Sequence, residues 1–554
     1  MKKILKLSKT IRQDKLLVAG LYRLLWACLA TSLLTALIQF FGPLMARKYL
    51  NDVSPQNIVI ACALILGSFV LVACLQLVFL LFKNRRCVHI KSKMLSCLIN
   101  RILALKYDAL IAKEPTYLLD RALSVVEALF DFYSETLPGL FTNITTILAC
   151  YVAVLIIHWP LTIVFTLIIL IQFFGYRGLN EKLGKMSVRL SKIAAQRYTI
   201  LNSLLGNVDF LKQLSDRTAI QDFTYEKERD EKKIEAEINI FAGKVSIVFD
   251  NLLSIFSNGI YVYIPIALMM KWMSLGDSVY LSLVSSLFMP AAKKMVGARL
   301  NMKALYAADE FLNKEIAPNL ENETDGLTLV EPVTSMTFDI NDLSIGDKNI
   351  LNRGTAQISS GDIVKISGET GSGKSSLAKS IVGFRAVKQA TINGTSIQDY
   401  SAESIRNHIL YIPQQAPVFS GTIAENIMLG LNDSVSDEWL GDRLKDTIFQ
   451  KYVVEAYGLT SMVLENGSNL SGGDKQKISL ARTEIFPWDV LILDEATSAL
   501  DTKTQKELLS YICEKARARG AIVFIISHSM EVNGFCTKEI RVENQAISCK
   551  ELDQ

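Results

Sequence analysis

Long apolar stretches occupy most of the chain before Ala317, whereas the remainder has the composition of a soluble domain. A helix needs about 20 apolar residues to cross a bilayer, and a helix is expected there because its backbone groups bond to one another. The predicted spans are Leu24–Met45, Asn57–Phe82, Leu137–Ile157, Leu161–Tyr176, Val245–Met270 and Val279–Val296. The first part of the chain is therefore predicted to be an all-α, six-helix transmembrane domain.

Basic residues flank the first two spans, and they predict the orientation of this domain. Cytoplasmic segments of membrane proteins carry an excess of Lys and Arg. We therefore expect a cytoplasmic N-terminus, a first span that is not cleaved, short external loops and two long intracellular excursions. A membrane anchor without a transport role is the alternative on topology alone. The flanking residues are Lys2, Lys3, Lys6, Lys9, Arg12 and Lys15 before the first span, and Lys83, Arg85, Arg86, Lys91 and Lys93 after the second.

A glycine-rich loop ending in a lysine follows the apolar run Ile363–Ile366 and precedes a helix-favouring run. Strand, Gly-x4-Gly-Lys-Ser and helix is the pattern of a phosphate-binding loop, in which backbone N–H groups and a helix N-terminus face phosphate oxygens. Lys374 would add a positive charge and Ser375 a hydroxyl for Mg2+. A plain glycine-rich turn is the alternative on spacing alone. The loop residues are Gly368, Glu369, Thr370, Gly371, Ser372, Gly373, Lys374, Ser375 and Ser376.

A second apolar run, Val490–Leu493, reads as a buried strand and ends in two carboxylates, Asp494 and Glu495. Beside a phosphate-binding loop, such a pair has a specific use. Asp494 can hold Mg2+ through water, and Glu495 can polarise the water that attacks the phosphate. A solvated strand end without catalytic function is the alternative.

Further motifs occur around these two, and together they resemble those of ATP-binding cassette (ABC) proteins. Leu470–Asp474 is similar to the family's signature motif, Glu495–Asp501 to its D-loop region, Ile526–His528 to its switch histidine, Tyr411–Gln414 with Phe419–Ile427 to the Q-loop of its exporters, and Glu465–Asn469 to the segment that precedes the exporter signature. Six spans ahead of one nucleotide-binding domain also resemble the plan of an exporter half-transporter. The resemblance implies a transmembrane domain at 1–316 and an α/β P-loop ATPase domain of ABC type at 336–554. The stretch 317–335 between them has the polar, proline-containing composition of a linker.

The resemblance also implies a mechanism that needs two chains. ATP, with Mg2+, would be bound between the phosphate loop of one domain and the signature of another, and hydrolysed there. The implied site residues are Ser471, Gly472 and Gly473 on the signature side, Glu495, His528 and Gln414 for catalysis, and Ser375, Gln414 and Asp494 for Mg2+. Because Glu495 and His528 are both present, a homodimer is favoured over a heterodimer. Segments near Tyr107–Tyr117 and Asp209–Arg217 are the candidates for coupling the ATPase to alternating access.

Two positions depart from the family pattern. Asp474 stands where the family usually has Gln, which suits a helix N-terminus but places a negative charge near the triphosphate. ATPase activity is expected to survive, at a reduced rate. The position of the adenine-stacking aromatic aligns with Ile345–Asp347, none of which is aromatic. Base stacking is then weaker, unless Phe338 or another ring takes that place.

The cargo is less constrained than the ATP site. Lys293 and Lys294 follow Pro290 in the sixth predicted span, and charge inside a membrane is a hint of function. They would meet an acidic or phosphate-bearing cargo; lysines at a cytoplasmic helix end are the alternative. Asp250, Asn251 and Asn258 in the fifth span carry the same ambiguity. A peptide, a lipid and an amphipathic drug all fit, and no peptidase-like region precedes the first span, so leader cleavage is not expected.

Composition argues against several other classes. The net charge is +4, which gives no strong argument for a nucleic-acid partner. The nine cysteines form no C-x-x-C pair and read as small buried hydrophobes. The spans and the family resemblance together imply an ATP-driven exporter of an amphipathic molecule in the cytoplasmic (inner) membrane, with its ATPase domain in the cytosol. A regulatory or sensor membrane protein, or one half of a heterodimeric transporter, is the alternative.

Overall fold

The computed structural model describes residues 15–552 except 53, 114, 215, 217, 322–325, 341–342, 346–347, 386–389 and 432–434. The described residues form two compact units. The first comprises the chain up to Leu103 together with Lys113–Asn319, and the second comprises Ala104–Ala112 and the chain from Leu320. The basic residues predicted between Lys2 and Arg12 lie outside the described part, as do Arg217 and Asp347.

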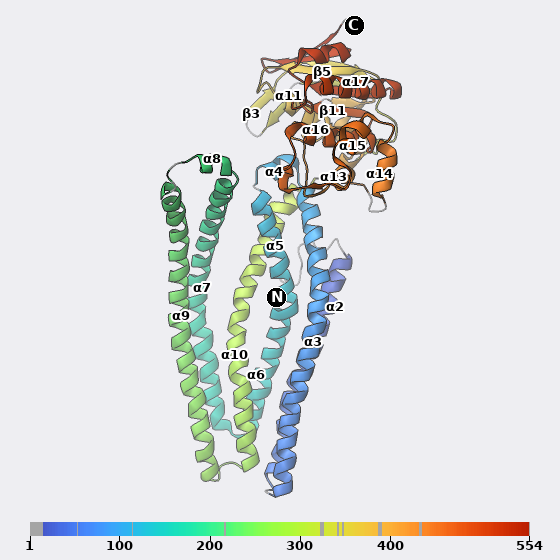
Figure 1. The fold of residues 1–554 in the computed structure, drawn as a ribbon. Coiled ribbons are helices and arrows are strands. Elements are labelled where there is room, and N and C mark those ends of the chain that lie inside the picture. The colour runs from blue at the N-terminus through green and yellow to red at the C-terminus, as the bar shows by residue number, and fades with distance from the viewer. Residues whose placement is uncertain are drawn as a thin grey trace. The chain divides into compact units, whose positions relative to one another are not determined.

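Long helices make up the first unit (Figure 1). Several run well beyond the length that a bilayer requires, because charged but helix-favouring sequence continues the apolar spans. The helices are α2 (Lys15–Leu50), α3 (Pro55–Leu103), α5 (Pro115–Asp131), α6 (Leu137–Ile157), α7 (Trp159–Leu205), α8 (Val208–Gln213), α9 (Thr218–Met269) and α10 (Leu275–Glu310), with π-helical turns at Phe132–Thr136 and Phe311–Ile316.

The predicted all-α membrane region is confirmed, whereas the count of six spans remains a prediction. Within the described residues, five helical stretches are long and apolar enough to cross a membrane: Gly20–Leu50, Pro55–Leu103, Tyr117–Ile157, Thr218–Met269 and Leu275–Met295. The fourth predicted span lies on α7, whose described apolar part, Trp159–Ile171, is shorter.

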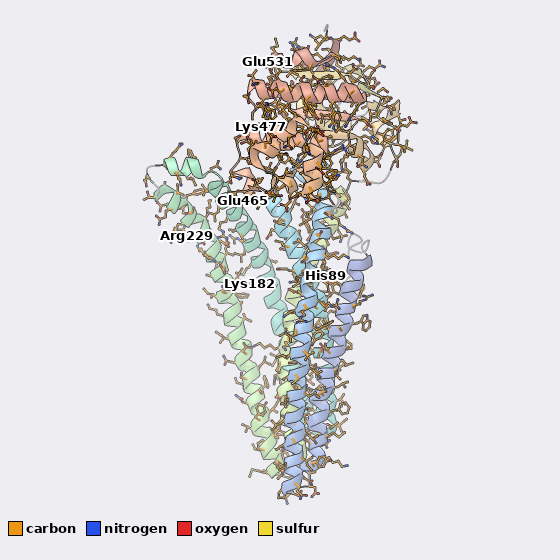
Figure 2. All side chains as sticks on the ribbon, turned by 45° about the vertical axis from the view of Figure 1, so that its right-hand side comes forward. His89, Lys182, Arg229, Glu465, Lys477 and Glu531 are labelled. Carbon is orange, nitrogen blue, oxygen red and sulfur yellow. The ribbon has the colours of Figure 1, made fainter. Side chains whose placement is uncertain are left out.

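Between the fourth and fifth predicted spans, Lys182 on α7 and Arg229 on α9 carry charge (Figure 2). The Lys182 ammonium lies 4.2 Å from the ring centroid of Phe241, so that the two helices contact one another through this pair. A cation–π contact of this kind contributes about 0.5–1 kcal/mol at an exposed site.

The turn before α10 is fixed against the C-terminal end of α2. Ser274 and Asp277 form a capping box at the start of α10. Arg47 donates to Asp277 Oδ1 at 2.5 Å, and the Gly276 N–H donates to Asn51 Oδ1 at 3.0 Å. A Cβ at Gly276 would overlap the Arg47 carbonyl oxygen, so only glycine fits this approach.

Two sheets form the frame of the second unit (Figure 1). The larger has the order β14-β13-β5-β12-β11-β8 and the smaller, antiparallel one the order β4-β1-β6-β7. The strands are β1 (Ser335–Asp339), β2 (Leu343–Ile345), β3 (Lys348–Leu351), β4 (Thr355–Ser359), β5 (Ile363–Gly368), β6 (Ala390–Ile392), β7 (Thr395–Ser396), β8 (Ile409–Ile412), β9 (Gly421–Thr422), β10 (Met462–Val463), β11 (Val490–Asp494), β12 (Ile522–Ile526), β13 (Lys538–Glu543) and β14 (Ala546–Glu551).

Helices cover this frame and include one short segment from the first part of the chain. They are α4 (Tyr107–Ile111), α11 (Lys374–Ile381), α12 (Ala402–His408), α13 (Ile423–Met428), α14 (Asp437–Leu444), α15 (Glu455–Tyr457), α16 (Gly472–Ala481) and α17 (Thr502–Arg519). The α/β class predicted for the ATPase domain is confirmed.

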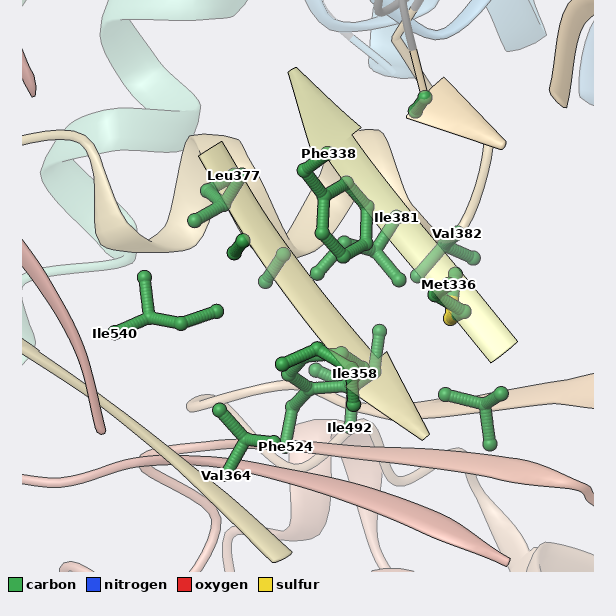
Figure 3. Close-up of a cluster of buried hydrophobic side chains, with 14 of the residues drawn as sticks. Met336, Phe338, Ile358, Val364, Leu377, Ile381, Val382, Ile492, Phe524 and Ile540 are labelled. Carbon is green, nitrogen blue, oxygen red and sulfur yellow. The ribbon is translucent and has the colours of Figure 1, made fainter. Parts of the chain in front are cut away.

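Alternate residues of the central strands enter two different cores. On β11, Val490 and Ile492 belong to one cluster, whereas Leu491 and Leu493 belong to the other. Figure 3 shows the first cluster, to which α11 contributes Leu377. Burial on both faces explains why β11 is apolar without alternation until it reaches Asp494.

The parallel strands of the large sheet end at one edge, and this edge gathers the predicted site residues. Strands β5, β12, β11 and β8 run parallel, with Asp494 beside Ile526, Ile526 beside Ile366, and Leu493 beside Ile412. Because carboxyl ends of parallel strands meet, the residues that follow each strand lie close together.

Phe338 does not take the place of the missing adenine-stacking aromatic. Its side chain is 1% exposed, belongs to the first core and meets Phe524 edge-on at 6.3 Å between centroids. Of the aligned stretch Ile345–Asp347, Ile345 closes β2 and the other two positions lie outside the described residues.

Candidate active site

The loop between β5 and α11 has the backbone that its glycines permit. Gly368, Gly371 and Gly373 have φ angles of +148°, +83° and +109°, which residues with a side chain rarely adopt. A Cβ at Gly373 would also lie 2.6 Å from Ile350 Cγ2. The glycines are therefore required where the chain curls ahead of the helix.

Lys374 is the first residue of α11 and is almost fully buried, at 6% exposure. Its Nζ donates to the carbonyl oxygens of Gly368 at 2.9 Å and Glu369 at 2.8 Å. The ammonium thus lies inside the curl of the loop, and its N–H groups donate to two neutral carbonyl oxygens. Phosphate oxygens would be stronger partners for the same group.

Asp494 stands at the end of β11 with each carboxylate oxygen bonded to a hydroxyl. Ser375 Oγ donates to Oδ1 at 3.1 Å, and the Tyr411 hydroxyl donates to Oδ2 at 2.8 Å. Burial, followed by the charge of Asp494, raises the pKa of Tyr411, so that this hydroxyl keeps its proton and stays a donor.

The donor set here suits Mg2+ only in the company of phosphate. Ser375 and Asp494 offer hard oxygen ligands, as Mg2+ prefers. Among the described residues, no group of three or more His, Cys, Asp and Glu side chains could hold a metal by itself. A Mg2+ ion would thus need further ligands from the bound nucleotide, which is how Mg2+ is held in many phosphate-transferring sites.

Glu495 follows Asp494 in a strained backbone conformation, with a φ of +50° that non-glycine residues seldom adopt. Its N–H donates to the Ile526 carbonyl at 3.0 Å, which holds it in place. Gln414 Nε2 donates to its Oε2 at 2.6 Å, and His528 Nε2 lies 3.4 Å from its Oε1. The three predicted catalytic side chains are therefore together, with Gln414 bonded to Glu495 rather than to the Ser375–Asp494 pair.

The signature segment begins α16, and its serine is already engaged. Ser471 accepts from the Asp474 N–H at 3.2 Å and donates its hydroxyl to Asp474 Oδ2 at 2.6 Å. Tyr457 donates to the other oxygen of Asp474, and Lys477 lies 3.4 Å from it. Burial raises the pKa of Asp474, but these donors outweigh it and lower the pKa overall, so that the carboxylate is charged near neutral pH.

The signature and the phosphate loop are not joined within the chain. Among the described residues, no hydrogen bond or ion pair joins Ser471, Gly472 or Gly473 to the loop Gly368–Ser376. A Cβ at Gly473 would instead lie 2.9 Å from the Ala499 carbonyl oxygen, so this glycine allows α16 to approach the segment after β11.

Two family models match the sequence, one for each part of the chain. Residues 25–291 match the ABC transporter transmembrane region, and residues 351–498 match the ABC transporter family. The chain is an ABC transporter. Both parts are fused in the half-transporter arrangement that the spans and motifs predicted, and the matched second part is a nucleotide-binding domain.

Several relatives and one solved structure are similar to this chain. A probable ABC transporter ATP-binding/permease protein of Haemophilus influenzae is 25% identical over 83% of the chain and 84% of its own length. An ATP-dependent lipid A-core flippase of Pasteurella multocida is 35% identical over 33% of the chain and 32% of its length, and the lactococcin-G-processing and transport protein of Lactococcus lactis is 28% identical over 50% and 39%. A bacterial Atm1-family ABC exporter with ATP bound shares the fold, with a TM-score of 0.79 at 18% identity over 96% of this chain and 95% of that one.

Sequence reasoning missed one buried side chain in this ABC transporter that supports the site. Gln476 is 3% exposed and accepts from the Ala499 N–H at 2.9 Å. Its amide also donates to the Glu495 carbonyl at 3.4 Å and to Ser498 Oγ at 3.3 Å. It thereby ties α16 to the backbone of Glu495. The sequence offered one indication of this role, because Gln476 lies inside the signature stretch, one helical turn after Gly472.

The predicted cargo residues lie on α9 and α10. Lys293 Nζ lies 2.6 Å from Asp250 Oδ1, with side chains 55% and 39% exposed, so two of the candidates form an ion pair with each other. Lys294 and Asn258 are exposed, and Asn251 donates to the Ile247 carbonyl at 2.8 Å. The pairing reduces the net charge that Lys293 would present to a cargo.

Proposed function

We propose that the chain is one half of an ATP-driven exporter, which hydrolyses ATP at sites shared between two chains. The observation that carries this proposal is the gathering of Lys374, Ser375, Asp494 and Glu495 at one sheet edge, while Ser471–Gly473 have no bond to them. A second chain would supply the missing signature. An identical chain suits this role because each copy carries both halves of a site.

In the proposed hydrolysis, the loop N–H groups and the α11 N-terminus bind the phosphates of ATP. Lys374 exchanges its two carbonyl acceptors for phosphate oxygens. Bound Mg2+, held by Ser375 and Asp494, would supply charge neutralisation to the phosphates. Glu495 accepts a proton from the attacking water once the Gln414 amide no longer donates to the Glu495 carboxylate. His528 lies beside Glu495 and would contact the γ-phosphate.

The coupling of this cycle to export belongs to the same proposal. Bound ATP would favour the state in which the two nucleotide domains are closed on each other, and hydrolysis would favour the open state. Switching between these two states would alternate access to a cavity in the membrane region. We assign the coupling role to α4 and α8, which overlap the stretches Tyr107–Tyr117 and Asp209–Arg217 of the sequence. We place the protein in the cytoplasmic membrane of a bacterium, with an amphipathic cargo, since relatives are named for lipid A-core and lactococcin G.

Transport into vesicles tests the export proposal. The purified chain in liposomes receives ATP outside, and a fluorescent phospholipid, an amphipathic peptide and a cationic dye are followed in separate experiments. ATP-dependent movement of one probe, lost in Glu495→Gln, is the expected result. Probe-independent ATP hydrolysis with no movement of any of the three would favour a regulatory membrane protein.

Asp474→Gln is expected to increase ATP turnover about fivefold, because a hydrogen bond to a charged acceptor is stronger by about 1 kcal/mol than one to a neutral acceptor. The substitution frees the Ser471 hydroxyl from the 2.6 Å bond to the carboxylate, so that it can bind a phosphate. Steady-state phosphate release measures the effect, and Glu465→Gln, an exposed acid before the signature, is the control (Figure 2). A slower variant would contradict this competition, and an inactive parent restored by the change would contradict a competent site.

Lys293→Ala combined with Lys294→Ala is expected to weaken ATPase stimulation by an anionic phospholipid about threefold, as removal of exposed charges near a membrane ligand does. Stimulation by a neutral amphipathic dye should not change. Asp250→Asn supplies the matched variant, because it breaks the Lys293 pair while keeping both lysines. Equal stimulation by the anionic lipid in all three proteins would exclude a cargo role for the lysines.

A further inference from the structure

Four side chains form a continuous line of contacts from α4 to the end of β11, all within the second unit. The ring of Tyr107 stacks on Phe384, with centroids 5.1 Å apart and planes 4° from parallel. Phe384 meets Tyr411 edge-on at 6.0 Å and 85°. The Tyr411 hydroxyl then donates to Asp494 Oδ2 at 2.8 Å. An aromatic path thus connects a segment of the first half of the chain with a proposed magnesium ligand.

The α4 end of this path is held by charge as well as by stacking. Arg385 Nε donates to Asp108 Oδ1 at 3.0 Å. The Arg385 guanidinium and the Lys379 ammonium lie 5.4 Å and 5.5 Å from the centroid of Tyr107. Cations near the ring and an ion pair beside it fix the orientation of Tyr107 relative to Phe384. In the chain, α4 follows α3 after the three residues Ala104–Lys106.

The other end of the path orients a carboxylate. Asp494 is 3% exposed, and its two oxygens have different partners. Tyr411 holds Oδ2, which leaves Oδ1 directed at Ser375 Oγ. A carboxylate that is hydrogen-bonded at one oxygen cannot rotate freely. Removal of a partner that orients a metal ligand in this way typically weakens metal binding by about 10- to 100-fold.

We propose that Tyr411 is a positioning residue for Asp494, and that the Tyr107–Phe384 stack sets the position of Tyr411. The state of α4 then changes the affinity of the ATP site for its divalent ion. Gln414 is not part of this path, because its amide donates to Glu495 Oε2. The inference rests on the proposed ATP-hydrolysing function, because it assigns Asp494 to the metal of that site.

Binding of Mn2+ in the presence of ATP tests the proposal without relying on turnover. The full chain in detergent carries Glu495→Gln, so that ATP stays intact, and electron paramagnetic resonance measures free Mn2+. Tyr411→Phe removes the hydroxyl but keeps the ring, and we expect it to weaken Mn2+ binding about tenfold. Tyr452→Phe, whose hydroxyl bonds to Glu507 instead, is the control and should bind as the parent does.

The stack is tested by its dependence on Tyr411. Tyr107→Ala should weaken Mn2+ binding about threefold, and Tyr107→Phe should not change it, because only the ring is used. Combining Tyr107→Ala with Tyr411→Phe should add nothing to Tyr411→Phe alone, since both changes act through one hydroxyl.

The outcomes separate this inference from the function on which it rests. A parent that binds no Mn2+ with ATP overturns both. A parent that binds normally, with Tyr411→Phe within about twofold of it, overturns only the positioning role. Additive effects in the double variant overturn the path from Tyr107 and leave Tyr411 as a local partner of Asp494.

Discussion

Glu495→Gln is expected to lower ATP turnover by about 10²- to 10³-fold, in the range that a general base contributes. Gln has the same shape and can still accept from the Gln414 amide, which donates to Glu495 at 2.6 Å. It cannot take a proton from water. ATP should therefore bind with unchanged affinity and remain unhydrolysed, so that the loss falls on turnover and not on binding.

Phosphate release and binding of a fluorescent ATP analogue measure the two quantities separately. Glu531→Gln is the matched control, since this acid lies on the surface three residues after His528 (Figure 2). The control should turn over as the parent does. Turnover in Glu495→Gln within a factor of about three of the parent would mean that another group activates the water.

Lys374→Ala is expected to weaken ATP binding about 30-fold and to reduce turnover at saturating ATP about 100-fold, because the ammonium contacts the phosphates in both the ground and the transition state. The folded state should survive, since the group bonds only to the carbonyls of Gly368 and Glu369, which water can reach once the side chain is gone. Displacement of the fluorescent analogue by ATP measures the first effect.

The control for this variant is Lys506→Ala on the exposed face of α17. It removes the same charge at a distance from the loop, and its ATP affinity should equal that of the parent. A Lys374→Ala protein that binds ATP as tightly as this control would show that the lysine does not contact phosphate.

The predictions that succeeded depend on local rules. The loop Gly368–Ser376 could be predicted because its glycines occupy backbone conformations open to few other residues. The strand before Asp494 could be predicted because burial on both faces demands an unbroken apolar run. The long helices could be predicted from apolar runs that charged, helix-favouring sequence extends.

Contacts between distant segments could not be predicted in the same way. Tyr457 and Asp474 meet through the path of the chain before α16, and no pattern connects them. The Lys293–Asp250 pair depends on the register of α9 against α10, which spacing along one helix does not determine. The stack of Tyr107 on Phe384 joins residues from opposite halves of the sequence, so only the folded chain reveals it.

The central claim is that two copies of this chain share each ATP site, and complementation tests it most directly. Lys374→Ala damages the loop side of a site, and Gly472→Arg damages the signature side. Each variant alone should be nearly inactive. In a co-expressed mixture, half of the dimers contain both variants, and each of these has one intact site, so about a quarter of the parent ATPase activity should return. Activity in the mixture that never exceeds the sum of the two separate variants would contradict shared sites in a homodimer.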